Sequence, residues 1–236
     1  MKTCILTFVV LLSAAVSGYA QELRFSRAQI DSIIAQAAVT YESPTIDSIR
    51  LEGTVEDLAA RFKEKGWTNP FSRFPERELE KAGFPKKTRN SNGVLLEGVC
   101  LDRKAKLILY PISPENREVA YAALMFSSNE KTIGQFIIND VMPLVHRYEG
   151  KYGEFSVCDL NERFEKCGWD ATREEYGSMQ HIVTFEFEAP EVILRSQTGP
   201  DGSFVVVVHY VNKINLATHF LETPRDYHHH PRRNHR

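Results

Sequence analysis

Apolar side chains recur every three or four residues in several stretches of this chain, which is the spacing of one face of a helix. The clearest stretch follows Thr54, and its apolar positions are Val55, Leu58, Ala59 and Phe62. Thr54 is a favourable N-cap, carboxylates occupy the first turn, and Gly66 stands where a helix would stop. We therefore predict a helix between Thr54 and Gly66.

Three further stretches have helical spacing. Residues 132–149 carry a long apolar stripe that contains Pro143, so we expect a second long helix with a kink at the proline. Residues 159–166 predict a third, shorter helix. Residues 21–43 are moderately amphipathic and form either a helix or a flexible leader before the domain.

Elsewhere the apolar period changes to two, which is typical of strands. Residues 46–52 predict one short strand. Two groups of three longer strands follow, and their predicted ranges are 94–101, 104–112 and 118–126, then 180–188, 191–197 and 203–212. The connections within each group are short, so each group should form an antiparallel meander. The apolar run at residues 205–208 must be covered on both faces, which predicts a central strand.

These elements predict an α+β domain over residues 44–221, made of two antiparallel three-stranded meanders packed with at least three helices. A segment is also repeated: residues 57–67 and 159–169 agree at six of eleven positions, and both end in Gly-Trp. The alternatives are a single unit or a duplicated helix-plus-meander unit with halves 44–127 and 128–221. In either case we expect Trp67 and Trp169 to anchor their helices in the core.

The first 20 residues have the three parts of a secretory signal peptide. Lys2 is followed by an apolar stretch over residues 5–16, and small residues occupy the last and third-last positions before Gln21. The stretch is shorter than the roughly 20 apolar residues that span a bilayer. We therefore expect cleavage after Ala20 and an exported protein, in the periplasm or outside the cell. No later segment predicts a transmembrane span.

The composition of the chain argues against some classes of function and assigns none. The chain of 236 residues is 42% hydrophobic and 25% charged, which is typical of a globular protein. Its formal net charge of −2 argues against nucleic acid as the main partner. A basic strip at residues 81–89 contains one aromatic residue and is interpreted as a solvated loop.

After cleavage three cysteines would remain, Cys100, Cys158 and Cys167. If residues 159–166 are helical, Cys158 and Cys167 lie about 13 Å apart, beyond the roughly 7 Å limit for a disulfide. Either Cys100 pairs with one of them, or all three are buried thiols. The sequence does not decide between these pairings.

No residue set is strong enough to assign as a catalytic, cofactor or metal site. Glu186 and Glu188 lie about 7 Å apart on one strand face, a spacing that glycosidases use, but the solvated face of a strand explains it better. His181 and His209 lie on strands of the second meander, and we interpret them as structural. The His/Arg-rich residues 222–236 are interpreted as a flexible, weakly chelating tail.

Four features of the chain carry a resemblance to known proteins. They are the signal peptide, the Gly53-Thr54 helix start, the segment 93–98 that leads a meander, and the helix ending in Lys151-Tyr152-Gly153. Together they resemble uncharacterised exported proteins of gut Bacteroidetes. The order of elements is similar to that of the beta-lactamase inhibitor protein and of the small outer-membrane assembly lipoproteins. These resemblances imply an exported helix-plus-meander fold and no particular chemistry.

The sequence therefore favours an exported, non-enzymatic protein that binds another protein or an envelope component. Zincin, nucleophile-elbow and phosphate-loop motifs are missing from the chain. Two alternatives stay open: a hydrolase of envelope or dietary glycan, and a structural envelope component.

Overall fold

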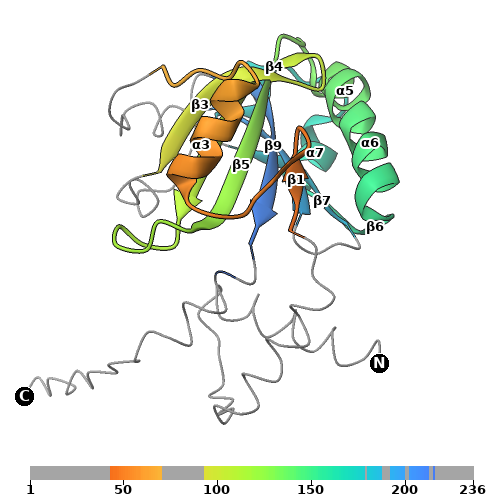
Figure 1. Ribbon diagram of the computed structural model, residues 1–236. Helices are drawn as coiled ribbons and strands as arrows, with labels where there is room; N and C mark the ends of the chain where they lie inside the picture. Colours follow the sequence, from red (N-terminus) through yellow and green to blue (C-terminus); the bar gives the residue numbers. More distant parts are fainter. Residues whose placement is uncertain are drawn as a thin grey trace, which may run out of the picture.

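The computed structural model describes residues 43–70, 93–178, 180–187, 192–199, 202–212 and 215. Its centre is a seven-stranded antiparallel sheet with the order β3-β4-β5-β9-β8-β7-β6 (Figure 1). The strands are β3 (Val94–Cys100), β4 (Arg103–Pro111), β5 (Val119–Ser128), β6 (Phe155–Leu160), β7 (His181–Phe187), β8 (Val192–Thr198) and β9 (Phe204–Val211). A small hairpin, β1 (Thr45–Ile46) and β2 (Ile49–Arg50), forms a second sheet.

The prediction of two separate three-stranded meanders is wrong. Both meanders form, but their last strands pair, since Tyr121 of β5 faces Val211 of β9 and Ser128 faces Phe204. Both strands carry buried apolar side chains on their two faces, for example Leu124 and Met125 on β5. An apolar strand at an exposed edge would tend to aggregate, and the β5–β9 pairing places both strands inside one sheet. The central position of β9 confirms the interpretation of residues 205–208.

The first predicted helix is α3 (Val55–Glu64). The amide of Asp57 donates to the Thr54 hydroxyl oxygen at 3.1 Å, so Thr54 is the N-cap that its position suggested. Gly66 adopts a φ of +89°, which glycine tolerates at the end of a helix. The apolar stripe of α3 is buried against the sheet.

The second predicted helix is one helical run with a π-helical turn inside it: α5 (Ile133–Phe136), η2 (Ile137–Val141) and α6 (Met142–Tyr152). Pro143 has no N–H to donate, so an ordinary helix would lose a hydrogen bond here. The wider turn places the amide of Met142 against the Ile137 carbonyl instead. The π-helical turn ends directly before Met142 and Pro143, and the kink expected at the proline stays a prediction.

The prediction of a third helix over residues 159–166 is wrong in its first half. Residues 159 and 160 belong to β6, which pairs with β7, and the helix α7 (Glu162–Cys167) begins later. Asn161 caps it by accepting from the Arg163 amide at 2.8 Å. A further short helix, α8 (Arg173–Tyr176), follows with a capping box formed by Thr172 and Glu175.

The described helices pack on one face of the sheet, and Figure 1 shows α3, α5, α6 and α7 on this face. The main core lies between them and the sheet. The opposite face has a smaller buried cluster made of strand residues: Leu95, Ile108, Tyr110, Ala123, Met125 and Val207. Within the described ranges, no helix combines the length and the apolar character that a membrane span requires.

The repeated Gly-Trp segments adopt similar local contacts in different surroundings. Trp67 meets Phe62 edge-on at 5.5 Å between ring centroids, and Trp169 meets Phe164 edge-on at 5.2 Å. Trp67 is only 2% exposed, as expected for a core anchor, whereas Trp169 is 54% exposed. The expectation that both tryptophans are buried is therefore wrong for Trp169. The division into halves 44–127 and 128–221 stays a prediction.

Candidate functional site

The residues singled out in the sequence do not converge on one site. Glu186 is exposed on β7, while Glu188 and the tail 222–236 lie outside the described residues, as does the basic strip. His181 of β7 pairs with Gln197 of β8, whereas His209 of β9 pairs with Ile193 of β8. The two histidines therefore lie at different positions along the strands. Over the ranges that the structure covers, no cluster of three or more His, Cys, Asp or Glu residues is arranged to hold a metal.

All three cysteines of the domain are free thiols. Cys100 is buried at the end of β3, whereas Cys158 on β6 and Cys167 at the end of α7 are exposed. The expectation that unpaired cysteines would all be buried is therefore wrong. Since Cys158 lies on a strand, the helical distance calculated from the sequence does not apply to this pair.

A small cavity opens beside Cys100, where α6 passes over the end of the sheet. It has a volume of about 60 Å³, room for a few water molecules. The lining comes from the β1–β2 hairpin, the β3–β4 turn, α6 and β9, and its residues are Thr45, Ile46, Asp47, Cys100, Leu101, Arg147, Tyr148, Lys151 and Tyr210. Sequence reasoning missed this site because its lining comes from four separate segments.

The floor of this cavity is neutral and its rim is charged. Tyr148 and Tyr210 are hydrogen-bonded through their hydroxyl groups. Burial raises the pKa of Cys100 to about 11 and raises the pKa of Tyr148, so both keep their protons at neutral pH. At the rim, the Lys151 ammonium donates to the Thr45 carbonyl at 2.8 Å, which attaches α6 to the hairpin.

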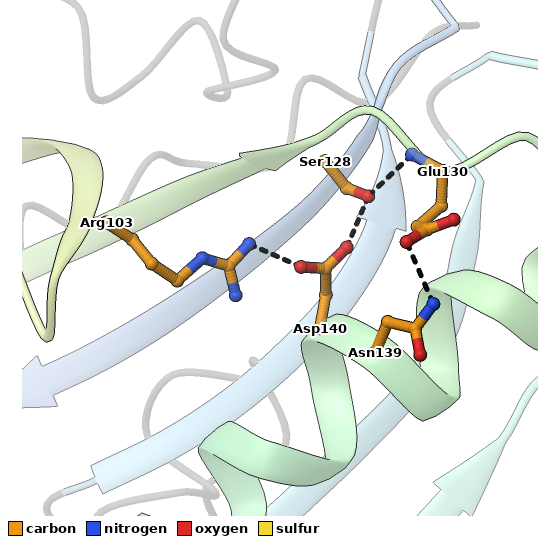
Figure 2. A network of polar contacts seen from close by, with 5 residues as sticks. All are labelled: Arg103, Ser128, Glu130, Asn139 and Asp140. Atoms are coloured by element: carbon orange, nitrogen blue, oxygen red, sulfur yellow. Dashed lines mark hydrogen bonds and ion pairs between the residues drawn. The ribbon is translucent and has the colours of Figure 1, made fainter.

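A polar network holds the π-helical turn against the sheet (Figure 2). Asp140 of η2 accepts from Arg103 of β4 at 2.6 Å and from the Ser128 hydroxyl of β5. Asn139 donates to the Glu130 carboxylate at 2.9 Å, and the Glu130 amide donates to Ser128 at 3.1 Å. The polar groups of these residues are hydrogen-bond partners of one another, so we interpret the network as a structural connection rather than a site for a ligand.

On the opposite face, the Tyr121 hydroxyl bonds Nδ1 of His209, and the two rings stack at 5.7 Å. Nε2 of His209 is buried and has no hydrogen-bond partner among the described residues. Burial, followed by the positive charge of Arg195, lowers the pKa of His209 to about 3. The imidazole is therefore neutral in the folded protein, which suits a structural residue.

The two ends of the sheet differ in how their outer edges are covered. At the β3 end, Thr68 and Glu97 exchange two backbone hydrogen bonds of 2.8 Å, and Trp67 packs on Gly98. At the other end, β6 is the last of the described strands. Its side chains Phe155 and Leu160 are 38% and 39% exposed. No described segment pairs with the outer side of β6, and an edge of this kind offers unpaired backbone groups beside apolar side chains.

The register shows which backbone groups of β6 face outward. The Asn161 amide donates to the Ile182 carbonyl at 2.9 Å, and the pairing continues with Leu160 opposite Val183 and Cys158 opposite Phe185. In an antiparallel pair the hydrogen-bonded positions alternate. The N–H and C=O groups of Cys158 and Leu160 therefore point away from β7.

Comparisons of the chain with protein-family models, with curated proteins and with solved structures each found no match.

Proposed function

We propose that this chain is an exported protein that acts by binding, and that its partner adds an extended segment to the outer edge of β6, the last of the described strands. The observation that carries the proposal is this edge, which has outward backbone groups and exposed apolar side chains at Phe155 and Leu160. Strand addition uses backbone hydrogen bonds for affinity and side chains for specificity. The partner is a protein, or an envelope component with a protein part.

The composition of β6 supports this proposal. Proteins protect exposed edge strands with lysine, proline or a covering segment. The sequence of β6 is Phe-Ser-Val-Cys-Asp-Leu, which contains neither lysine nor proline. On the helix side of the sheet, Phe155 packs edge-on against the buried Phe185 at 5.2 Å between centroids. An added strand with apolar side chains on this side would therefore extend the main core.

The charges near β6 favour a basic partner segment. Residues 154–162 contain the carboxylates of Glu154, Asp159 and Glu162 and no lysine or arginine. All three side chains are exposed. Complementary charge accelerates association and selects among partners. An extended segment with lysine or arginine beside apolar residues fits this edge.

The test uses proline to remove an outward backbone donor. Mature protein and its Cys158→Pro variant are immobilised and exposed to a solubilised envelope fraction of the producing cell, and the retained proteins are quantified. The Cys158 amide points away from β7, so proline should leave the β6–β7 ladder intact while blocking an added strand. We expect the variant to lose the retained partner and Asp159→Lys to weaken its binding.

The matched control is Cys158→Ala, which removes the thiol and keeps the amide. It should retain the partner as the parent does, and all variants should have parental thermal unfolding curves. Equal retention by Cys158→Pro and the parent would overturn strand addition. Absence of any partner retained by the parent would overturn the binding function itself.

A further inference from the structure

The cavity beside Cys100 is bordered by two tight turns with unusual backbone geometry. Asp47 and Ser48 in the β1–β2 hairpin have φ values of 48° and 63°, and Leu101 and Asp102 in the β3–β4 turn have values of 54° and 61°. Glycine, asparagine and aspartate are the usual residues in two-residue turns of this type, so Ser48 and Leu101 are the exceptions. The left-handed conformation costs other residues about 1 kcal/mol or more. Asp47 and Leu101 both line the cavity, so the two strained turns meet there.

The floor of the cavity keeps one strong hydrogen-bond donor that the tyrosine pair does not use itself. In the Tyr148–Tyr210 pair one hydroxyl donates to the other, and the accepting hydroxyl keeps a proton of its own to donate. Cys100 is protonated, so its thiol is a further weak donor. A ligand group that accepts hydrogen bonds satisfies these donors.

The charged residues that line the cavity favour an anion. They are Arg147, Lys151 and Asp47, two cations and one carboxylate. Lys151 already donates to Thr45, whereas Arg147 is exposed on the rim and can donate two parallel N–H groups. The guanidinium fork matches the two oxygens of a carboxylate.

The volume limits the ligand to a small group. At about 60 Å³ the cavity is well below the roughly 300–1,000 Å³ of pockets that enclose whole cofactors or drug-sized molecules. We propose that this cavity binds a carboxylate group, with Arg147 at the rim and the Tyr148–Tyr210 pair at the floor as its hydrogen-bond donors. The carboxylate belongs either to a small organic acid or to a peptide C-terminus.

Cys100 provides the readout because it lines the cavity and is otherwise buried, with 4% of its surface exposed. In a Cys158→Ser, Cys167→Ser background it is the one cysteine of the mature chain, and its alkylation rate by iodoacetamide is measured at constant ionic strength. Acetate and N-acetylglycine are titrated as the two carboxylate sources, and acetamide and N-acetylglycinamide as neutral counterparts. At about ten times the Kd, bound ligand should slow alkylation roughly tenfold.

We expect protection by at least one acid, none by the amides, and loss of protection in Arg147→Met. The control Lys131→Met removes an exposed charge just before α5, sixteen residues before Arg147 along the same helical run, and should keep full protection. Protection by N-acetylglycine alone identifies a peptide C-terminus, and equal protection by acetate identifies a general carboxylate site. No protection by either acid, or unchanged protection in Arg147→Met, would overturn the proposal.

Discussion

The contact between Trp67 and Gly98 allows a sharp test of how the first helix is anchored. A Cβ atom added at Gly98 would lie 2.3 Å from Cδ2 of Trp67 and 2.7 Å from Cγ and Cε3. Carbon atoms do not approach this closely, so Gly98→Ala must displace the indole ring. The indole is packed against Phe62 and is 2% exposed, so the ring has little room to move.

The expected magnitudes follow from this geometry. Trp67→Ala should lower the free energy of unfolding by about 4 kcal/mol, as for other large aromatics removed from a core. Gly98→Ala should lower it by about 1–3 kcal/mol through overpacking. In the double variant the clash is absent, and alanine is favoured over glycine within a strand by up to about 1 kcal/mol. The double variant should therefore be no less stable than Trp67→Ala.

The assay is equilibrium urea unfolding of the four proteins of this double-mutant cycle. Lys63→Ala, an exposed position on α3, is the control and should change stability by less than about 0.5 kcal/mol. A coupling energy of about 2 kcal/mol in favour of the double variant is expected. If the two single effects simply add, the indole does not lie against Gly98 and the proposed anchoring is wrong.

Three further outcomes are expected. Burial holds the pKa of His209 at about 3 in the folded state, and the unfolded chain protonates near pH 6.5, so stability should fall as pH drops from about 6.5 toward 3. Urea titrations across this window should show a shallower fall in His209→Gln. Asp140→Asn weakens the 2.6 Å contact with Arg103 and should lower the free energy of unfolding by about 1–2 kcal/mol. Its control is Glu97→Gln, which affects an exposed pair with Lys106 and should lower it by less than about 0.5 kcal/mol in the same assay. Mass spectrometry of exported protein should find Gln21 at the N-terminus, and retention of residues 1–20 would remove the argument for export.

The parts of the fold that depend on local sequence could be predicted. Helix α3 has a continuous apolar stripe, an N-cap at Thr54 and a stop at Gly66, and all three signals lie within a few turns. The six strands of the meanders follow from alternation and short turns in the same way. Each of these elements is specified by residues that are neighbours along the chain.

The parts that depend on distant pairing could not be predicted. The contact between β5 and β9 joins strands more than 70 residues apart, and no local pattern specifies that register. At residues 159 and 160, pairing with β7 replaced the helix that the repeated segment suggested, since Asn161 provides a later cap. This is a case in which tertiary hydrogen bonds override local preference. The position of β6 as the outermost of the described strands was missed for the same reason.

The second Gly-Trp segment tests whether the two repeats have the same energetic role. A Cβ atom at Gly134 would lie 2.9 Å from the Trp169 backbone oxygen, which also accepts from the Gly134 amide at 2.8 Å, and 3.2 Å from the indole.

Removing the Trp169 side chain leaves that carbonyl in place, so Trp169→Ala should not relieve Gly134→Ala. We therefore expect a coupling energy below about 0.5 kcal/mol for this pair, by urea unfolding. Trp169→Ala alone should cost about 2 kcal/mol, roughly half the cost at Trp67, because the side chain is 54% exposed. Strong coupling between Gly134 and Trp169 would mean that the indole, rather than the backbone, holds this segment to α5, as Trp67 holds α3 to β3.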